Sequence, residues 1–552
     1  MPMAADEAVG FPKLGPTDIA ALTARGHERG VRAGDVLFNA GDRSFCFYVV
    51  LEGSIEIVEQ SHDEPRTVAV HQAGGFTGDV DMLTGRPAVV TARAGQDGRV
   101  LELSTGELRR AVDELPDLGE TIVKAFLMRR ELLLSQGFSV VKILGSRFSP
   151  DAHRLRDFAV RNAIPFRWID LETDEQADTL LRQFNVPAAA TPIVIGRDGH
   201  WASNPTNVEF AGCAGLSLEL EEGHVYDLVV VGAGPAGLAA SVYAASEGLD
   251  VLTVDALAAG GQAGTSSRIE NYLGFPTGIS GADLTRNATL QAQRFGPKIT
   301  VPSTVRALSL DSGDRIVTLT DGSRLRTRCA LVASGVQYKR LDVPGFPDFE
   351  AAGIYYAATD MEARLCKGEE VVVVGAGNSA GQAIVFLSKY ARRVHVVVRG
   401  ADLGASMSRY LVDRILGLDN VTVHLGSTVT GLDGDGNLSA VHATDRDGQR
   451  HTFDTTSLFL FIGADPNTDW LRGCAELDRK GFVLTGSALP PATAKGERWR
   501  TADRAPFLLE TSLPGVFAAG DVRSGSVKRV ASAVGEGAMA VSFVHAHIAR
   551  PG

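Results

Sequence analysis

Two glycine-rich segments have the residue types and the spacing that dinucleotide binding requires. The first, residues 232–237 (GAGPAG), directly follows the apolar residues 228–231. Glycines at this spacing let the backbone approach a pyrophosphate at the N-terminus of the following helix. The next apolar segment, residues 251–254, ends at Asp255, whose carboxylate can accept hydrogen bonds from a ribose diol. The alternatives are a purely structural turn and an ordinary turn acid at Asp255.

The second glycine-rich segment, residues 375–380 (GAGNSA), follows the apolar residues 371–374. The next apolar segment, residues 394–398, ends at Arg399 instead of an acid. Arginine can pair with a 2′-phosphate that a carboxylate would repel, so the sequence favours NADPH over NADH. A solvated arginine at a strand end is the alternative. The residues predicted to bind NADPH are Gly375, Gly377, Asn378, Ser379, Ala380 and Arg399.

Each glycine-rich segment needs a strand before it and a helix after it, which predicts two Rossmann-like α/β domains. One site has an acid, Asp255, after its second strand and the other has a base, Arg399, which suggests FAD at the first site and NADPH at the second. Hydride would then pass from NADPH to the flavin. This transfer depends on positioning rather than on an acid–base side chain, so no conventional catalytic residue is predicted.

The bulk composition is that of a globular protein with several domains. The chain has 552 residues and a net charge of −12, which argues against general nucleic-acid binding. The N-terminus lacks the features of a signal peptide, and the apolar run 228–245 is better interpreted as strand, turn and helix than as a membrane span. Five scattered cysteines without a Cys-x-x-Cys predict no metal site and suit a cytoplasmic protein.

From about residue 226 to the end, the sequence resembles the low-molecular-weight thioredoxin reductases of the pyridine nucleotide-disulphide oxidoreductase class. The shared motifs are Gly260-Gly261-Gln262, Glu270-Asn271-Tyr272, Ala333-Ser334-Gly335 with Arg340, Ile462-Gly463 with Pro466-Asn467-Thr468, Gly515 to Asp521, Arg529-Val530-Ala531 and Gly535-Glu536-Gly537. The resemblance implies that Asp521, Gln262 and Asn271 lie near the flavin, and that the helix after Val530 points its N-terminus at it. It also implies a homodimer. The residues predicted to bind FAD are Gly232, Gly234, Pro235, Ala236, Gly237, Asp255, Gly261, Gln262, Asn271, Gly335, Gly520, Asp521, Arg529, Val530 and Ala531.

The redox dithiol of that family is missing from this sequence. Ala357 and Asp360 occupy the two cysteine positions, and Cys366 has no neighbouring cysteine. A single thiol cannot form the intramolecular disulphide that takes electrons from the flavin, so the family's route to thioredoxin is not expected here.

Residues 139–216 resemble a small thioredoxin- or glutaredoxin-like α/β module. Thr191-Pro192 falls at the site of the family's cis-proline, and Ser149-Pro150-Asp151-Ala152 replaces its Cys-Pro-x-Cys. Serine without a base is a poor nucleophile, so we expect a docking or scaffold module. An unrelated α/β linker domain is the alternative.

Residues 1–138 resemble a cyclic nucleotide-binding domain, including a hairpin predicted around residues 51–53. The cassette that holds the nucleotide is degenerate, because Ala88 replaces the phosphate-binding arginine and Asp81 adds a negative charge beside the phosphate. We therefore expect weak or absent cAMP binding, unless Arg86 or Arg93 replaces the lost arginine. The residues assigned to this degenerate site are Gly78, Asp79, Arg86 and Ala88.

The predicted fold is multidomain: an N-terminal β-roll, a small α/β thioredoxin-like module and two Rossmann-like dinucleotide-binding domains. The predicted boundaries are 1–138, 139–216, a linker at 217–225, the FAD domain at 226–342 and 461–552, and the NADPH domain at 343–460. Three functions remain open: an NADPH oxidoreductase that passes electrons from FAD to an unidentified acceptor, a ferredoxin- or flavodoxin-NADP reductase, and a non-enzymatic redox sensor.

Overall fold

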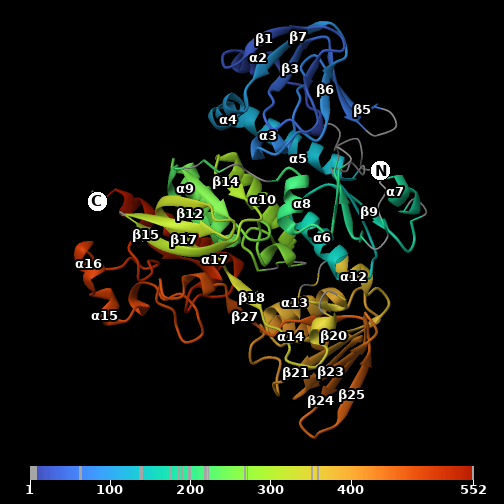
Figure 1. Cartoon of the computed structure of the whole chain (residues 1–552), viewed down its shortest axis with the longest axis vertical. Helices are drawn as coiled ribbons and strands as arrows, with labels where there is room; N and C mark the ends of the chain where they lie inside the picture. The colour runs from blue at the N-terminus through green and yellow to red at the C-terminus, as the bar shows by residue number, and fades with distance from the viewer. Residues whose placement is uncertain are drawn as a thin grey trace.

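The computed structural model describes residues 9–549, apart from 61–64, 136–140, 175–176, 184–186, 188–189, 197–199, 217–219, 222, 267–268, 270, 312, 350–351, 357 and 359. The described residues form four structural units, and the unit near residue 400 is inserted between two parts of the unit before it. Figure 1 shows the blue N-terminal unit and the orange unit near residue 400 at opposite ends of the molecule.

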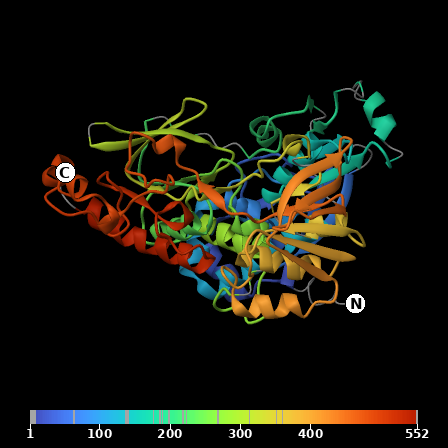
Figure 2. The ribbon, with the colours of Figure 1, turned by 90° about the horizontal axis from the view of Figure 1, so that it is seen from below.

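The unit that contains the first glycine-rich turn is built on a seven-stranded sheet with the order β14-β13-β12-β17-β16-β15, in which β28 pairs with β17. Helices α9 and α17 pack against each other beside this sheet, and the red α17 lies next to the green helices in Figures 1 and 2. The strands and main helices are β12 (Val225–Val231), α9 (Pro235–Ser246), β13 (Val251–Val254), α10 (Gly281–Arg294), β14 (Lys298–Thr300), β15 (Val305–Asp311), β16 (Asp314–Leu319), β17 (Arg324–Val332), β28 (Val516–Ala518) and α17 (Val530–Ile548). Shorter helical segments are η2 (Ala263–Thr265), η3 (Asp469–Leu471), η4 (Gly486–Ala488), α15 (Pro491–Ala494), α16 (Glu497–Thr501) and η5 (Gly520–Val522).

The unit that contains the second glycine-rich turn is joined to the unit that contains the first turn by an antiparallel pair of strands. These strands are β18 (Val336–Tyr338) and β27 (Ala464–Pro466). Its five-stranded parallel sheet has the order β19-β26-β20-β21-β22, and an antiparallel sheet β23-β24-β25 follows. The elements are α11 (Phe346–Phe349), β19 (Ile354–Tyr355), α12 (Asp360–Leu365), β20 (Glu370–Val374), α13 (Asn378–Leu387), β21 (Arg393–Val398), α14 (Arg409–Leu416), β22 (Val421–Leu425), β23 (Thr428–Gly434), β24 (Leu438–Thr444), β25 (Arg450–Asp454) and β26 (Leu458–Leu460).

Among the described residues, the N-terminal unit contains two small antiparallel sheets and several helices. Its elements are α2 (Pro16–Thr23), β1 (His27–Val31), β2 (Val36–Phe38), β3 (Phe47–Glu52), β4 (Ser54–Gln60), β5 (Pro65–Gln72), α3 (Val80–Thr84), β6 (Thr91–Ala94), β7 (Gly98–Leu103), α4 (Thr105–Glu114) and α5 (Pro116–Ser135).

The predicted hairpin at residues 51–53 is wrong, because β3 pairs with β7 whereas β4 pairs with β5 and β6. Gly53 carries the chain from one sheet to the other with φ +83°, and a Cβ atom there would lie 2.8 Å from the Asp97 carbonyl oxygen. The turn at Gly53 therefore packs against the loop that contains Asp97, instead of joining two paired strands.

The middle unit has a four-stranded mixed sheet with the order β11-β10-β8-β9, in which β8 and β9 are parallel and β10 is antiparallel to both of its neighbours. The Thr191-Pro192 peptide bond is cis, as expected. Ser149 caps a helix, since its Oγ accepts a hydrogen bond from the Ala152 amide at 3.3 Å. The elements are β8 (Val141–Gly145), α6 (Pro150–Arg161), β9 (Phe166–Asp170), α7 (Ala177–Gln183), β10 (Ile193–Ile195), β11 (Trp201–Ser203) and α8 (Asn207–Cys213).

Helix α10 of the first dinucleotide unit connects that unit to the N-terminal unit. Leu290 on α10 packs against the N-terminal core, and Arg294 lies 3.5 Å from the Asp113 carboxylate. Helix α3 of the N-terminal unit also packs on α10. Of the helices in the described ranges, none combines the length and the apolar character needed to cross a bilayer.

Candidate functional site

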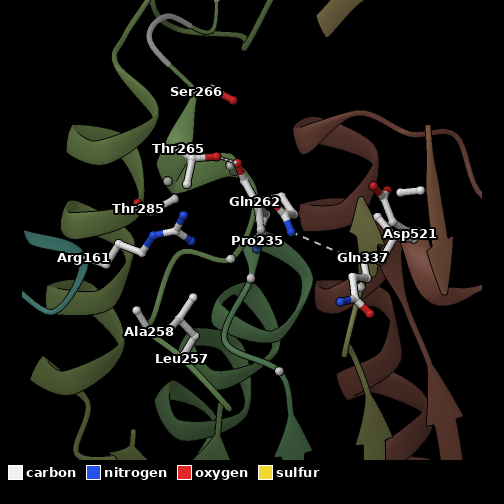
Figure 3. Close-up of a pocket in the computed structure, with 18 of the residues that line it drawn as sticks. Arg161, Pro235, Leu257, Ala258, Gln262, Thr265, Ser266, Thr285, Gln337 and Asp521 are labelled. Carbon is white, nitrogen blue, oxygen red and sulfur yellow. Dashed lines mark hydrogen bonds between the residues drawn. The ribbon is translucent and has the colours of Figure 1, made fainter. Parts of the chain in front are cut away.

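Both glycine-rich turns open onto one continuous cavity of about 2690 Å³. Its walls come from both dinucleotide units, and also from the middle unit and the N-terminal unit. Figure 3 shows the part of a pocket in which Gln262, Gln337 and Asp521 lie on one side and Leu257 and Ala258 on another.

The first glycine-rich turn connects β12 to α9, and its three glycines lack a side chain for two different reasons. A Cβ atom on Gly232 would lie 2.2 Å from the Ala333 carbonyl oxygen, and one on Gly237 would lie 1.8 Å from the Gly232 carbonyl oxygen. These two glycines therefore permit close backbone packing. A Cβ atom on Gly234 would meet nothing nearer than the Gly261 Cα at 3.9 Å, so its open side faces the cavity.

Asp255 lies at the end of β13, in the cavity wall, and organises the turn around it. Its carboxylate accepts hydrogen bonds from the amides of Ala233 at 2.8 Å, Leu257 at 2.9 Å and Ala258 at 3.1 Å. Burial raises the pKa of this carboxyl, and the three amide hydrogen bonds oppose that shift. Because the two oxygens together accept three such bonds, lone-pair capacity remains for a ribose hydroxyl.

Three helix N-termini at the cavity share one feature: among the described residues, no side chain caps them. Helix α9 begins after Gly234, α13 after Gly377 and α17 after Arg529, and all three capping residues line the cavity. The first amides of a helix have no partner within the helix, and their partial positive charge attracts anions. The cavity therefore offers three sites for phosphate oxygens or for charge on a flavin.

Most of the residues predicted to bind FAD line the cavity, but three do not. Gly237 is packed inside the turn, whereas Asn271 and Ala531 are exposed and are not part of the cavity wall. The place of Asn271 and Ala531 beside the cofactor therefore stays a prediction. In the first turn of α17, the buried Ala533 lines the cavity instead, because it lies on the inward face of the helix. The predicted FAD residues in the wall are Gly232, Gly234, Pro235, Ala236, Asp255, Gly261, Gln262, Gly335, Gly520, Asp521, Arg529 and Val530.

Gln262 and Asp521 lie in the part of the cavity that is predicted to hold the flavin. The Gln262 side-chain amide donates to the Val336 carbonyl at 3.4 Å, a contact drawn in Figure 3. Lys528 donates to the Asp521 carbonyl at 2.7 Å. Burial raises the pKa of the Asp521 carboxyl, and the charge of Lys528 opposes this shift.

All six residues predicted to bind NADPH lie in the cavity wall: Gly375, Gly377, Asn378, Ser379, Ala380 and Arg399. A Cβ atom on Gly375 would lie 2.4 Å from the Phe461 carbonyl oxygen, whereas one on Gly377 would meet nothing within 4 Å. The Asn378 side-chain oxygen accepts from the Ser408 amide at 2.7 Å and so holds the neighbouring loop. Arg399 is exposed, where its guanidinium can meet a phosphate.

The positions of the missing dithiol are only partly described. Ala357 lies outside the described residues, and Asp360 begins α12, where its side chain is not described. All five cysteines of the chain are free. Cys366 is fully buried, and burial raises the pKa of its thiol to about 11.

In the degenerate cassette, an internal ion pair lies beside the predicted nucleotide site. Asp79 caps α3 by accepting from the Asp81 amide at 3.0 Å, and the Asp81 carboxylate lies 2.8 Å from Arg130 Nη1. Burial, and then the charge of Asp81, raise the pKa of Asp79 to about 7. Ala88 is buried, and its backbone pairs with Asp42 and Gly41.

The structure brings this cassette to the dinucleotide cavity, which the sequence did not predict. Asp81 and Arg86 line the same cavity as the glycine-rich turns, whereas Gly78, Asp79 and Ala88 do not. Arg130 links the units, since it pairs with Asp81 and also donates to the Ala163 carbonyl of the middle unit at 3.0 Å.

Two basic residues of the cavity wall also escaped sequence reasoning. Lys528 directly precedes the predicted Arg529, so its closeness to that motif was a usable signal. Arg161 lies at the end of α6 in another unit, and no local pattern connects it with the glycine-rich turns.

Comparison with known proteins agrees with this geometry. Residues 226–537 match the family described as Pyridine nucleotide-disulphide oxidoreductase, and residues 28–114 match the Cyclic nucleotide-binding domain. NADPH-dependent thioredoxin reductase 3 of Arabidopsis thaliana is 33% identical over 324 residues, which cover 57% of this chain and 57% of that protein. Thioredoxin reductase of Streptomyces clavuligerus is 30% identical over 327 residues, which cover 59% of this chain and 94% of that protein. The match thus spans little more than half of the plant relative and nearly all of the bacterial one.

Solved structures show the same fold over the same part of the chain. Thioredoxin reductase of T. acidophilum has a TM-score of 0.51 at 30% identity, covering 58% of this chain and 98% of that one. The Lactococcus lactis enzyme has a TM-score of 0.52 at 23% identity, covering 58% and 99%. Thioredoxin reductases of this family bind FAD and depend on NADPH, and the two glycine-rich turns fit those cofactors. The chain therefore belongs to the pyridine nucleotide-disulphide oxidoreductase family of FAD-dependent enzymes, with a cyclic nucleotide-binding domain at its N-terminus.

Proposed function

We propose that this protein oxidises NADPH through bound FAD and passes the electrons to an acceptor outside the chain, without a redox dithiol. The observation that carries the proposal is the cavity itself. Two glycine-rich turns and three helix N-termini without a side-chain cap among the described residues open onto one space.

The residues of the two turns bind and orient the cofactors. The amides at the N-terminus of α9, next to Gly234, hold the FAD pyrophosphate, and Asp255 accepts from the adenosine ribose. The N-terminus of α13, next to Gly377, holds the NADPH pyrophosphate, and Arg399 pairs with the 2′-phosphate. Bound FAD supplies the chemistry, because it can accept hydride from NADPH and release electrons to an acceptor.

Electrons must leave the flavin without a cysteine pair in this chain. None of the five cysteines is in a disulphide, and Ala357 and Asp360 replace the family's two sulphurs. Cys366 is buried with its pKa raised to about 11, so near neutral pH it stays a thiol and a poor nucleophile. We therefore propose that the acceptor is a disulphide, a quinone or a redox protein that takes electrons from the flavin directly.

Rapid mixing of the purified protein with NADPH, and separately with NADH, tests this function. We expect faster bleaching of the flavin with NADPH, followed by recovery of colour when a suitable acceptor is added. Selective recovery with ferredoxin would favour a ferredoxin-NADP reductase. Slow bleaching with both nucleotides would favour a redox sensor and contradict the proposal.

Residues 139–216 are proposed to be a thioredoxin-like module without a dithiol. The order of its mixed sheet supports this interpretation, and Ser149 caps a helix at the position where thioredoxin-like modules have their first cysteine. The domain boundaries given above, the homodimer and the cytoplasmic location stay predictions.

A further inference from the structure

Arg161 brings a positive charge into the cavity from outside the family fold. It is the last residue of α6 in the middle unit, whereas the family match begins at residue 226. Its side chain lines the cavity, and Figure 3 shows its guanidinium pointing towards Pro235 and Thr285. The nucleotide-binding part of the chain therefore does not form this wall alone.

The loop after Arg161 is fixed on two sides. The buried Asn162 donates from its side-chain amide to the Leu257 carbonyl at 3.1 Å, which ties it to the loop that follows Asp255. The next residue, Ala163, accepts from Arg130 Nη2 at 3.0 Å. The loop is therefore held by the N-terminal unit and by the first dinucleotide unit. These contacts place Arg161 rigidly at the cavity wall.

The guanidinium of Arg161 has N–H groups that are available for further hydrogen bonds. Its Nε lies 2.8 Å from the Asp157 carboxylate, one helical turn earlier, and its side chain is 29% exposed. Its two terminal nitrogens have no hydrogen-bond partner among the described residues, and the guanidinium forms no ion pair with the described Asp255 carboxylate. An arginine in this state can still make a charge-assisted pair of hydrogen bonds to a phosphate.

The position of Arg161 in the cavity indicates which group of a bound nucleotide it would contact. Arg161 faces the first glycine-rich turn, at Pro235, and its charge acts on Asp255 in the same wall. These two residues bracket the place where a pyrophosphate joins the adenosine ribose. We propose that Arg161 binds a phosphate oxygen of the FAD pyrophosphate, so that the middle module completes the FAD site. This inference rests on the proposed function, because it requires FAD in this part of the cavity.

Titration of the full-length, deflavinated protein with FAD tests the inference by affinity rather than by activity. Arg161→Gln should raise the Kd for FAD roughly tenfold, and Arg161→Lys should restore part of the loss. The affinity of the unsubstituted protein should fall more steeply with salt than that of Arg161→Gln, because one phosphate pairing has been removed. Arg182→Gln, at an exposed arginine on α7 of the same module, should change neither quantity.

Two further comparisons separate phosphate binding from a purely structural role. Asp157→Asn removes the internal partner of Arg161 and should leave FAD affinity equal or tighter, whereas a structural ion pair would make it as harmful as Arg161→Gln. ADP should compete with FAD less well in Arg161→Gln, whereas adenosine should compete equally in both proteins. Wild-type protein that binds no FAD would contradict the proposed function. FAD binding by the wild type with an equal Kd in Arg161→Gln would overturn the inference alone.

Discussion

At the scale of single residues, we propose that the charge of Arg399 decides which nucleotide the second turn prefers. Arg399 is exposed directly after β21, in the cavity wall, at the position where the first turn has Asp255 after β13. Its contact with a 2′-phosphate would be charge-assisted but screened by water. The nucleotide preference therefore depends on one solvated side chain.

Arg399→Ala should raise the KM for NADPH roughly five- to tenfold and leave the KM for NADH unchanged. Steady-state kinetics with each nucleotide measures this. Arg393→Ala, at an exposed arginine where the same strand begins, is the matched control and should alter neither value. Equal losses with both nucleotides would show that Arg399 has no role in selecting the 2′-phosphate.

Asp79 makes the stability of the N-terminal unit depend on pH. Its pKa is raised from 3.8 to about 7 by burial and by the charge of Asp81. Because the folded protein holds this proton more tightly than the unfolded chain does, stability is greatest below about pH 4 as far as Asp79 is concerned, and it is lost as pH rises towards 7.

Asp79→Asn should remove this loss while keeping the oxygen that caps α3. In urea unfolding between pH 5 and 8, the variant should gain stability over the wild type as pH rises, at about 1.4 kcal/mol per pH unit at most. A constant difference across this range would contradict the assignment of the raised pKa to Asp79.

At the scale of elements, we propose that the two strand–turn–helix units bind different nucleotides in the same way. The side chain added by Gly234→Ala or Gly377→Ala has room in the protein itself, since the nearest atom to a new Cβ is 3.9 Å away in the first case and more than 4 Å in the second. It would instead fill the space that a pyrophosphate needs.

The two alanine substitutions should therefore have separate effects. Gly234→Ala should weaken FAD binding by on the order of tenfold, and Gly377→Ala should raise the KM for NADPH by a similar factor. Each variant serves as the control for the other, with the melting temperature of the apoprotein unchanged in both. Loss of FAD from Gly377→Ala would show that the assignment of the two turns is wrong.

Features that depend on contacts between neighbouring residues in the sequence were predictable, and features that depend on distant contacts were not. The turns at Gly232 and Gly375 were predictable because strand, glycines and helix are contiguous. The hairpin at residues 51–53 was not, because the contact of Gly53 is with Asp97, far along the chain. Asn271 was placed by its motif alone; it is exposed outside the cavity wall, and its place beside the cofactor stays a prediction.

At the scale of the whole molecule, the cavity depends on how the four units pack. Arg130 of the N-terminal unit pairs with Asp81 in the cassette and donates to Ala163 of the middle unit. The loop that contains Ala163 also contacts the first dinucleotide unit through Asn162, so these contacts connect three of the units. These contacts join residues without a shared motif, so the sequence could not predict them. The Arg130–Asp81 pair is nearly buried, with 11% and 3% of the two side chains exposed.

Arg130→Met should lower the free energy of unfolding by about 3–5 kcal/mol, because it leaves the Asp81 carboxylate buried without its partner. The double variant Arg130→Met with Asp81→Leu should recover part of this loss, since the Asp81 charge is then removed, while Asp79, whose carboxylate lies 3.9 Å from Arg130, still loses that partner. Urea unfolding of the wild type, the two single variants and the double variant measures the coupling. Purely additive effects would contradict a buried ion pair at this junction.

The central claim is that electrons pass through a flavin in a protein that has no redox-active pair of sulphurs. Anaerobic reductive titration, followed by flavin absorbance, measures it most directly. We expect full reduction after two electron equivalents per FAD, because the proposed flavin takes up two electrons and the five cysteines of the structure are free. Uptake of four equivalents per FAD would reveal a disulphide in redox exchange with the flavin and would contradict the account.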